Sequence, residues 1–516
     1  MHNQGIGPWV SRRLERSRGH VALAYRDERL RYEDLAARID RLANALVDRG
    51  VGAGDRVAYL GNNHPSFLES LFATALIGAI FVPLNTRLAP PEVQFALEDS
   101  GAETLILHEE FRDLARAGSW PTGVSRRIVV DGPADAAVEE YESVLVSGAT
   151  THRDDPVSLD DPAIILYTSG TTGHPKGAVL THGNLTWNCF NALVDYGVSA
   201  DERVLLISPL FHVAALSMGA LPVLLQGGTV ILHEKFDPGH VLSTIQSEGI
   251  TMLSGVPTTF QMLQEHADWD TTDLSSLQHL TCGGSTMPER MLQAYEDRGL
   301  AFSCGYGMTE TSPGATAMPP SMSRTKMGSS GVPHFFTDVK IVDGEGRTVP
   351  PGEVGEIWVK GPNVIKEYWR RPEATEASIV DGWFRSGDLG SFDEDGYIFI
   401  SDRLKDMIIS GGENIYSAEV EGRIMEIPQI AAVALIGVPD PKWGEVPLAI
   451  VALKPGEQLE AEQITGHLAG RLAKYKIPKR VVFVDELPRT ASGKVRKADL
   501  RAQFAATTAS AGEERS

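Results

Sequence analysis

Cysteine is scarce in this chain, and the few cysteines form no pattern. There are three among 516 residues, Cys189, Cys282 and Cys304, an odd number at wide spacing. Disulfide-stapled proteins carry even sets of cysteines, and structural zinc sites need closely spaced pairs. The sequence therefore excludes a disulfide framework and a structural zinc site, and it predicts a protein of the reducing cytoplasm.

Positive charge is also in short supply. The chain has 47 Lys and Arg residues against 68 Asp and Glu residues, which gives a formal net charge of −21 at pH 7. A nucleic-acid partner requires a basic surface that neutralises phosphates, and none is predicted here. The acidic excess is instead typical of a surface that keeps a protein soluble.

Long apolar runs are missing as well. The most apolar window, residues 216–225, is interrupted by Gly219 and Pro222. It is far shorter than the ~20 residues that span a bilayer. The first residues contain no continuous apolar core of the kind found in secretory signals. We therefore expect neither an integral membrane segment nor a secretory signal.

Helix-like and strand-like segments alternate through the first half of the chain. Residues 32–49 carry apolar side chains at helical spacing, whereas residues 56–60 and 79–83 have the short apolar pattern of buried strands. This alternation predicts an α/β fold with largely parallel sheets.

The composition changes twice in the second half. Short strands separated by Gly, Pro and Asp turns follow residue 328 and predict a small antiparallel barrel or sheet. A compact α+β stretch, with a helix expected at residues 461–472, follows the second change near residues 402–406. The predicted domains are an N-terminal domain, 1–404, a C-terminal domain, 405–504, and a disordered tail, 505–516.

Residues 167–177, Tyr-Thr-Ser-Gly-Thr-Thr-Gly-His-Pro-Lys-Gly, have the clearest chemical meaning. Their hydroxyls, glycines and lysine offer N–H and O–H donors and one mobile positive charge to a polyphosphate. The segment is not a Walker A loop, because its lysine is followed by glycine rather than by serine or threonine. The candidate phosphate-binding residues are Thr168, Ser169, Gly170, Thr171, Thr172, Gly173 and Lys176.

Four further segments follow this loop, and their order along the chain is informative. They are residues 305–310 (Gly-Tyr-Gly-Met-Thr-Glu), 383–388 (Trp-Phe-Arg-Ser-Gly-Asp), 402–414, and 488–494 (Pro-Arg-Thr-Ala-Ser-Gly-Lys). Together with the loop they resemble the ordered motifs of the adenylate-forming superfamily, which includes acyl-CoA synthetases, firefly luciferases and peptide-synthetase adenylation domains.

The resemblance implies a fold and a reaction. The fold would be α/β, with a large N-terminal region of two α/β sheet subdomains and a small β-barrel-like part, and a small mobile α+β C-terminal domain. The enzyme would join a carboxylic acid to AMP with release of pyrophosphate from ATP, and would then pass the acyl group to coenzyme A. Joining two anions needs positive charge and a metal, here Mg²⁺, rather than a strong base. The partners would be small molecules (the acid, ATP and CoA), and the sequence allows a homodimer.

The same resemblance assigns roles at the reacting groups. Lys494 would bridge the carboxylate and the α-phosphate oxygens, and Thr309 would contact the α-phosphate. Glu310 would bind Mg²⁺, which favours carboxylate and phosphate oxygens. His212 matches a family histidine beside the acyl site, where it would gate or orient the acid. A satisfied core histidine is the alternative at that position.

Another set of residues would hold the nucleotide. Tyr306 would lie against adenine, and Asp388 offers paired acceptors for two ribose hydroxyls, with help from Arg403. Glycines let flat groups lie close to the backbone. Gly283, Gly284 and Ser285 would form the floor between adenine and the acyl chain, and Gly305 and Gly307 belong to the adenine and magnesium motif.

Rotation of the C-terminal domain would let one site perform both half-reactions. Lys405 matches the family's hinge residue. Rotation would replace the catalytic lysine with the loop that contains Gly411 and Gly412, and would open a channel for the pantetheine arm of CoA. Lys442 and Trp443 are candidates for this channel, with a solvated lysine and a buried tryptophan as equal alternatives.

The identity of the acid stays open. Residues 366–369 and 406–410 resemble segments of bacterial fatty acyl-CoA synthetases, whereas residues 3–7 and 59–65 resemble segments of bacterial feruloyl-CoA synthetases. Ala214 stands where plant coumarate ligases often have a tyrosine. The prediction is an acid–CoA ligase for a fatty or a hydroxycinnamic (ferulate- or coumarate-like) acid.

Other functions compete with CoA ligation. The main alternative is a stand-alone adenylation enzyme that loads a carrier-protein thiol. Amino-acid substrates are disfavoured, because residues 213–216 lack the aspartate that would hold the substrate ammonium. A luciferase-like oxygenase or a nucleotide sensor is a third possibility, but a sensor would have lost Glu310 or Lys494, and both are present.

Overall fold

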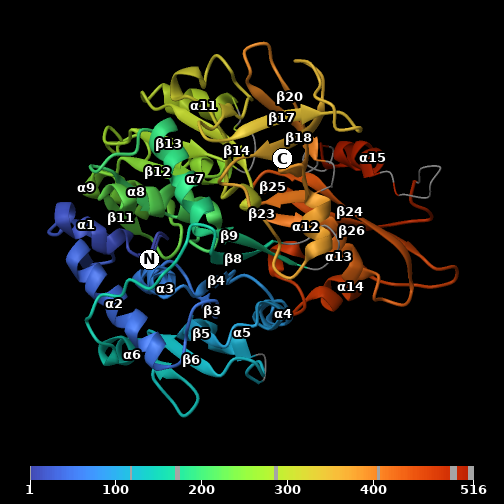
Figure 1. The fold of residues 1–516 in the computed structure, drawn as a ribbon. Helices are drawn as coiled ribbons and strands as arrows, with labels where there is room; N and C mark the ends of the chain where they lie inside the picture. Colours follow the sequence, from blue (N-terminus) through green and yellow to red (C-terminus); the bar gives the residue numbers. More distant parts are fainter. Residues whose placement is uncertain are drawn as a thin grey trace. The chain divides into compact units, whose positions relative to one another are not determined.

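The chain folds as two compact units. The first comprises Met1–Thr86, Gln94–Tyr167 and Gly177–Asp402, and the second comprises Arg87–Val93, Thr168–Lys176 and Arg403–Ser516 (Figure 1). A computed structural model describes residues 2–116, 119–168, 175–283, 287, 289–403, 407–488, 495 and 497–509. The predicted boundary between Leu404 and Lys405 lies outside the described residues, and the sequence did not predict that residues 87–93 and 168–176 would group with the second unit.

One sheet of the first unit has the strand order β7-β6-β5-β3-β4-β8-β9. Its strands are β3 (Arg56–Leu60), β4 (Ile80–Leu84), β5 (Thr104–His108), β6 (Arg126–Val130), β7 (Glu139–Glu140), β8 (Pro162–Thr168) and β9 (Lys176–Thr181). The pairs from β7 through β8 are parallel, as the alternating pattern predicted. The accompanying helices are α2 (Tyr32–Asp48), α3 (Pro65–Leu76), α4 (Pro90–Ser100), α5 (Arg112–Arg116) and α6 (Tyr141–Ser147).

A second sheet has the order β16-β15-β14-β13-β12-β10-β11-β1-β2. Its strands are β1 (Val21–Tyr25), β2 (Glu28–Arg31), β10 (Arg203–Leu206), β11 (Thr229–Leu232), β12 (Met252–Gly255), β13 (His279–Cys282), β14 (Phe302–Gly307), β15 (Gly314–Ala317) and β16 (Val332–Pro333). Its interior is parallel, and both ends are antiparallel. The helices of this part are α1 (Trp9–Ser17), α7 (His182–Asp195), α8 (Leu221–Gln226), α9 (Pro238–Glu248), α10 (Pro257–Gln264) and α11 (Glu289–Glu296).

The expected small antiparallel sheet is formed by the last residues of the first unit. It contains β17 (Asp338–Val342), β18 (Gly355–Lys360), β19 (Ile379–Val380), β20 (Trp383–Phe392) and β21 (Ile398–Arg403), with α12 (Pro372–Ser378) before β19. Gly, Pro and Asp turns separate these strands, which is why the sequence pattern was readable. The α/β fold predicted for the large region is confirmed. Among the described helices, none is long and apolar enough to cross a bilayer.

The second unit is α+β, as predicted. Its strands are β22 (Met407–Ser410), β23 (Glu413–Tyr416), β24 (Ile430–Asp440), β25 (Gly444–Leu453) and β26 (Arg480–Val484), and its helices are α13 (Ser417–Ile424), α14 (Ala461–Leu468) and α15 (Lys497–Ala509).

Two predicted boundaries in this unit are wrong. The helix expected to reach residue 472 ends at Leu468, because Ala469 is extended and Gly470 has a φ of +76°. The tail expected to be disordered from residue 505 is helical through Ala509. Leu500 and Phe504 of α15 pack against an apolar cluster, and the alanines that follow favour helix.

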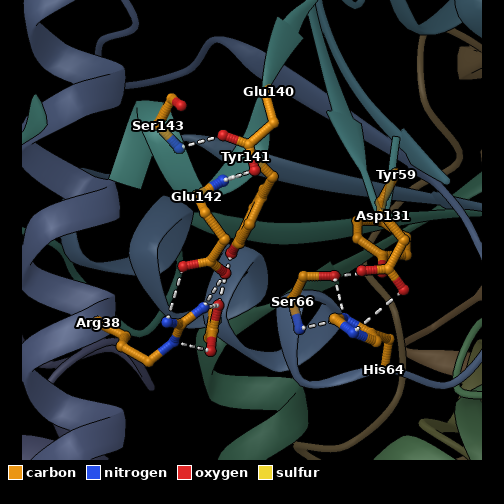
Figure 2. A network of polar contacts seen from close by, with 10 residues as sticks. Arg38, Tyr59, His64, Ser66, Asp131, Glu140, Tyr141, Glu142 and Ser143 are labelled. Atoms are coloured by element: carbon orange, nitrogen blue, oxygen red, sulfur yellow. Dashed lines mark hydrogen bonds and ion pairs between the residues drawn. The ribbon is translucent and has the colours of Figure 1, made fainter. Parts of the chain in front are cut away.

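An ionic network that surrounds the buried Glu69 carboxylate joins α2, α3 and α6 (Figure 2). Arg38 donates from Nε to Glu69 Oε1 at 2.6 Å and from Nη2 to Glu142 Oε1 at 2.5 Å. The Tyr141 hydroxyl donates to Glu69 Oε2 at 2.7 Å. Burial raises the pKa of the Glu69 carboxyl, and Arg38 opposes that shift. Arg38 and Tyr141 therefore satisfy a carboxylate that would be very unfavourable if it were buried alone.

Candidate active site

The motif that carries Glu310 ends β14 in a tight turn. Met308 N donates to Thr311 Oγ1 at 3.0 Å, and Thr311 Oγ1 donates to Pro313 O at 2.6 Å. A Cβ on Gly307 would lie 1.5 Å from Pro313 O, so only glycine fits there. The buried Thr311 side chain thus fixes the 3₁₀ turn in which Thr309 and Glu310 lie.

The Glu310 carboxylate is oriented by a tyrosine. Tyr368 OH donates to Glu310 Oε1 at 2.8 Å, and Ile365 N donates to Glu310 O at 2.9 Å. The next residue, Trp369, donates its N–H to Gly177 O at 2.7 Å. The same short segment therefore contacts the Glu310 turn and the strand that follows the phosphate-loop motif. The sequence did not identify Tyr368, whose only signal was its place in a motif of the resembled family.

The predicted adenine and ribose residues lie together. Tyr306 OH donates to Asp388 Oδ2 at 2.8 Å, and Asp388 N donates to Ser386 Oγ at 3.0 Å. Tyr306 N donates to Thr316 Oγ1 at 3.1 Å. The Asp388 side chain is nearly buried. Motifs about eighty residues apart thus form one polar site with a fixed carboxylate, which suits a pair of sugar hydroxyls.

His212 stands at the start of a turn that leads into a helix. Its N–H donates to Pro209 O at 3.1 Å, and its ring centroid is 4.8 Å from that of Phe211. The side chain is half-buried, and Ala214 is exposed. The half-buried ring that packs on Phe211 leaves the alternative of a satisfied core histidine open. The role of His212 toward the acid stays a prediction.

The second unit brings Gly411 and Trp443 into contact. Gly411 N donates to Trp443 O at 2.8 Å, and a Cβ on Gly411 would lie 2.6 Å from Trp443 Cε3. The Trp443 side chain is 41% exposed, and Lys442 Nζ lies 4.9 Å from the ring centroid. The alternative of a buried tryptophan is therefore wrong. An exposed indole beside a glycine loop offers a flat apolar surface.

The two ends of the phosphate-loop motif meet at its base. Thr168 Oγ1 donates to Lys176 O at 3.4 Å. Arg403 is the last residue of β21, and Gly283 and Gly305 lie in or beside β13 and β14. The predicted site residues outside the described residues are Ser169, Gly170, Thr171, Thr172, Gly173, Gly284, Ser285, Lys405 and Lys494.

A second polar cluster has the residue types of a nucleophile triad. Ser66 Oγ lies 2.8 Å from His64 Nδ1, and His64 Nε2 lies 3.9 Å from Asp131 Oδ2 (Figure 2). However, Ser66 is fully buried and shares a second hydrogen bond, of 2.8 Å, with Tyr59 OH. Burial lowers the pKa of His64 to about 4. The cluster caps α3, where His64 Nδ1 accepts from Ser66 N, and it offers no accessible nucleophile.

The role of Tyr368 can be tested by Tyr368→Phe. If Glu310 binds the Mg²⁺ and ATP that the motifs predict, loss of its hydrogen bond with Tyr368 should lower kcat/KM for ATP by about 10-fold, because an unfixed carboxylate is held less well in its working position. Steady-state kinetics with varied ATP and Mg²⁺ measure this. Tyr141→Phe is the matched control, because it also removes a tyrosine hydroxyl from a glutamate but leaves the site unchanged. An equal kinetic loss in both variants would contradict the role.

Known proteins resemble this chain over nearly its full length. The family model described as AMP-binding enzyme matches residues 10–369, and that of the AMP-binding enzyme C-terminal domain matches residues 419–494. The feruloyl-CoA synthase of an Amycolatopsis species is 51% identical over 504 residues, 98% of this chain and 100% of the relative. The indoleacetate–CoA ligase of Aromatoleum aromaticum is 42% identical over 506 residues, 98% of this chain and 99% of the relative. The solved fatty acyl CoA synthetase of Mycobacterium tuberculosis has 36% identity and a TM-score of 0.75, with 98% of this chain and 99% of that chain covered.

Proposed function

This chain belongs to the AMP-binding enzyme family and is an AMP-forming acid–CoA ligase, and we propose that its acid is a hydroxycinnamic acid of the ferulate type. The enzyme joins the acid to AMP at the expense of ATP and then transfers the acyl group to CoA. The adenylate-forming family and the acid–thiol ligase activity predicted from the motifs are confirmed. The observation that carries the choice of acid is the end-to-end identity of 51% with a feruloyl-CoA synthase.

The residues after His212 support an aromatic acid. Residues 213–220 contain no charged side chain, and Ala214 is exposed. A small exposed side chain leaves space for the flat ring of an aromatic acid.

The nucleotide is held by side chains that the structure already orients. We assign Asp388 to the ribose hydroxyls and Tyr306 to adenine, and the hydrogen bond between them keeps the carboxylate from rotating. Glu310 fits a Mg²⁺ ion, because this ion needs only one or two protein carboxylates beside phosphate oxygens and water. When bound, Mg²⁺ would offset the negative charge of the phosphates. Tyr368 holds the Glu310 carboxylate in one orientation.

The remaining assignments are proposals that rest on the motifs. Lys494 would place its ammonium between the carboxylate and the α-phosphate, where charge develops during attack. Lys405 would act as the hinge, and Gly411 and Gly412 would border the path of the pantetheine arm. The exposed Trp443 beside Gly411 supports that path. The homodimer allowed by the sequence stays a prediction.

The proposal is tested by pyrophosphate release and thioester formation across a panel of acids. Ferulate and coumarate should exceed palmitate and acetate in kcat/KM by about 10²-fold, a ratio that requires several favourable contacts. Thioester should form with CoA and not with a phosphopantetheinyl carrier protein in its place. Higher turnover of palmitate would overturn the proposed acid and leave the ligase activity intact. Turnover with the carrier protein alone would favour the alternative function.

A further inference from the structure

Helix α7 carries three asparagines on one buried face. Asn184, Asn188 and Asn191 follow the i, i+4, i+7 spacing that places side chains on one side of a helix. Each is at most 1% exposed. A buried amide is unfavourable unless its hydrogen bonds are satisfied, so each of these side chains needs polar partners in other segments. All three find them.

Asn188 contacts two separate segments of the first unit, a helical turn and the start of a strand. Its Nδ2 donates to Ser217 O at 3.0 Å and lies 3.2 Å from Met218 Sδ. Its Oδ1 accepts from Gly314 N at 3.0 Å. Ser217 lies in the helical turn Ala215–Ala220, which starts three residues after His212, and Gly314 is the first residue of β15, which follows the Glu310 turn. A single side-chain amide therefore joins the helical turn after the predicted acid residue to the start of the strand after the predicted metal residue.

The carbonyl of Ser217 needs a donor from outside its own helix. Residues Ala215–Ala220 form a π-helical turn, in which Leu221 N donates to Leu216 O. In this pattern the next donor would be the N–H of residue 222, which is proline and has none. Asn188 supplies the missing donor. A π-turn widened in this way is often found at functional sites.

The other contact fixes the backbone after Glu310. Gly314 begins β15, and a Cβ on it would lie 2.8 Å from Asn188 Oδ1. On the opposite side, Asn363 Nδ2 donates to Gly314 O at 2.6 Å and to Thr311 O at 2.8 Å. The peptide groups around Gly314 are thus held by asparagines from two directions. This leaves the Glu310 turn little freedom to shift.

We propose that Asn188 is a positioning residue for acid adenylation. By joining Ser217 O to Gly314 N, it keeps the His212 turn in register with the Glu310 turn, so that the acid and the phosphate meet in the reactive geometry. An apolar side chain of similar size would leave a buried carbonyl and a buried N–H without partners. The inference rests on the acid-activating function of this site and not on which acid is used.

The kinetic test compares two asparagines of the same helix face. Asn188→Ala should raise the KM for the acid and lower kcat/KM for adenylation by about 10²-fold, because a misplacement of about 1 Å can cost that much. Asn191→Ala is the matched control, since its amide contacts Thr337 Oγ1 and Phe336 N and reaches the Glu310 turn only indirectly, through Thr337 and Asn363. It should lower thermal stability to a similar degree and leave KM for the acid within about 3-fold. Equal kinetic losses in both variants would overturn the proposal.

A rescue experiment isolates the contact with Ser217. Pro222→Ala introduces a backbone N–H in the first turn of α8, where it can donate to Ser217 O, so the double variant Asn188→Ala/Pro222→Ala should recover part of the lost activity. Hydrogen exchange of residues 212–221, measured without substrates, should be about 10-fold faster in Asn188→Ala and slower again in the double variant.

The exchange measurement also separates this inference from the proposed function. If no acid of the panel turns over, the proposed function fails, and the exchange rates still decide whether Asn188 holds the turn. Unchanged exchange in Asn188→Ala would overturn the inference whatever the acid. Should that variant not fold, Asn188→Leu takes its place, because a leucine of similar size leaves little cavity and still removes both hydrogen bonds. Absence of rescue by Pro222→Ala would then count against the contact.

Discussion

Replacing Glu310 with glutamine should slow acyl-adenylate formation by about 10³-fold, because a metal ligand that stabilises transferred phosphate charge contributes several kcal/mol. The amide keeps the shape of the side chain and can still accept from Tyr368 OH, which lies 2.8 Å from Oε1 in the native chain. Only the negative charge is lost. Single-turnover release of pyrophosphate, measured over a range of Mg²⁺ concentrations, should show the loss and a weaker apparent affinity for the ion.

The control for this prediction is a neighbouring carboxylate. Glu367→Gln changes an exposed side chain beside Tyr368 and should leave the rate within about 3-fold. Thermal unfolding of both variants should resemble that of the native chain. If Glu310→Gln retains a rate within about 10-fold at low Mg²⁺, Glu310 is not the metal ligand, and the turn closed by Thr311 has a structural role instead.

The proposed nucleotide residues could be picked out of the sequence because each belongs to a short motif. Tyr306 and Asp388 were assigned to the nucleotide from local residue order, and the structure joins them through one hydrogen bond. The parallel strands were predictable for a related reason. A short apolar run such as β3, bounded by turn residues, is a local signal that needs no knowledge of partners.

The residues that hold the site together were not predictable in this way. Asn188 looks like an ordinary polar residue of a helix, because its partners Ser217 and Gly314 are far away in the sequence. Tyr368 is likewise explained only by its contact with Glu310. A hydrogen bond between distant segments produces no periodic pattern in the sequence. The sequence also does not show whether a given polar side chain is solvated or buried. The end of α15 was predicted wrongly for a similar reason. The helix continues past the predicted end because Phe504 packs against an apolar cluster of distant residues.

A buried lysine in the second unit was not predicted either, because its partners are also distant in the sequence. Its replacement has the largest expected effect on stability. Lys476 is 2% exposed, and its Nζ lies 2.6 Å from Glu92 Oε1 and 2.9 Å from Glu419 Oε1. Glu92 Oε2 accepts from the backbone N–H groups of Ala473 and Ala89. Two buried carboxyl groups thus share one ammonium, and the group carries an excess of negative charge once Glu419 is ionised.

Lys476→Met should destabilise the second unit by about 3–5 kcal/mol, because it leaves two buried carboxylates without their counter-ion. Native-state hydrogen exchange of β24 and β25, corrected for intrinsic rates, reports the unfolding free energy of this unit. Lys474→Met is the matched control, since Lys474 is exposed two residues away. It should change the free energy by no more than about 0.5 kcal/mol. Equal effects of the two substitutions would show that Lys476 is not the counter-ion.

The same cluster predicts a pH dependence with a definite sign. Burial, reinforced by Glu92 and opposed by Lys476, raises the pKa of Glu419 from 4.5 to about 7. Between these two values the folded chain binds more protons at Glu419 than the unfolded chain does. The contribution to the unfolding free energy is therefore largest below pH 4.5, falls as pH rises toward 7, and is constant above it.

Glu419→Gln should remove this slope and make the second unit more stable than the native one at pH 8, because the amide needs no proton and Lys476 keeps Glu92 as its partner. Hydrogen exchange of β24 and β25 at pH 5.5, 6.5 and 8, corrected for intrinsic rates, measures both effects. Glu421→Gln is the control, since Glu421 pairs with Lys497 and not with Lys476. An identical decline of the native chain and Glu419→Gln over this range would assign the pH dependence to another group.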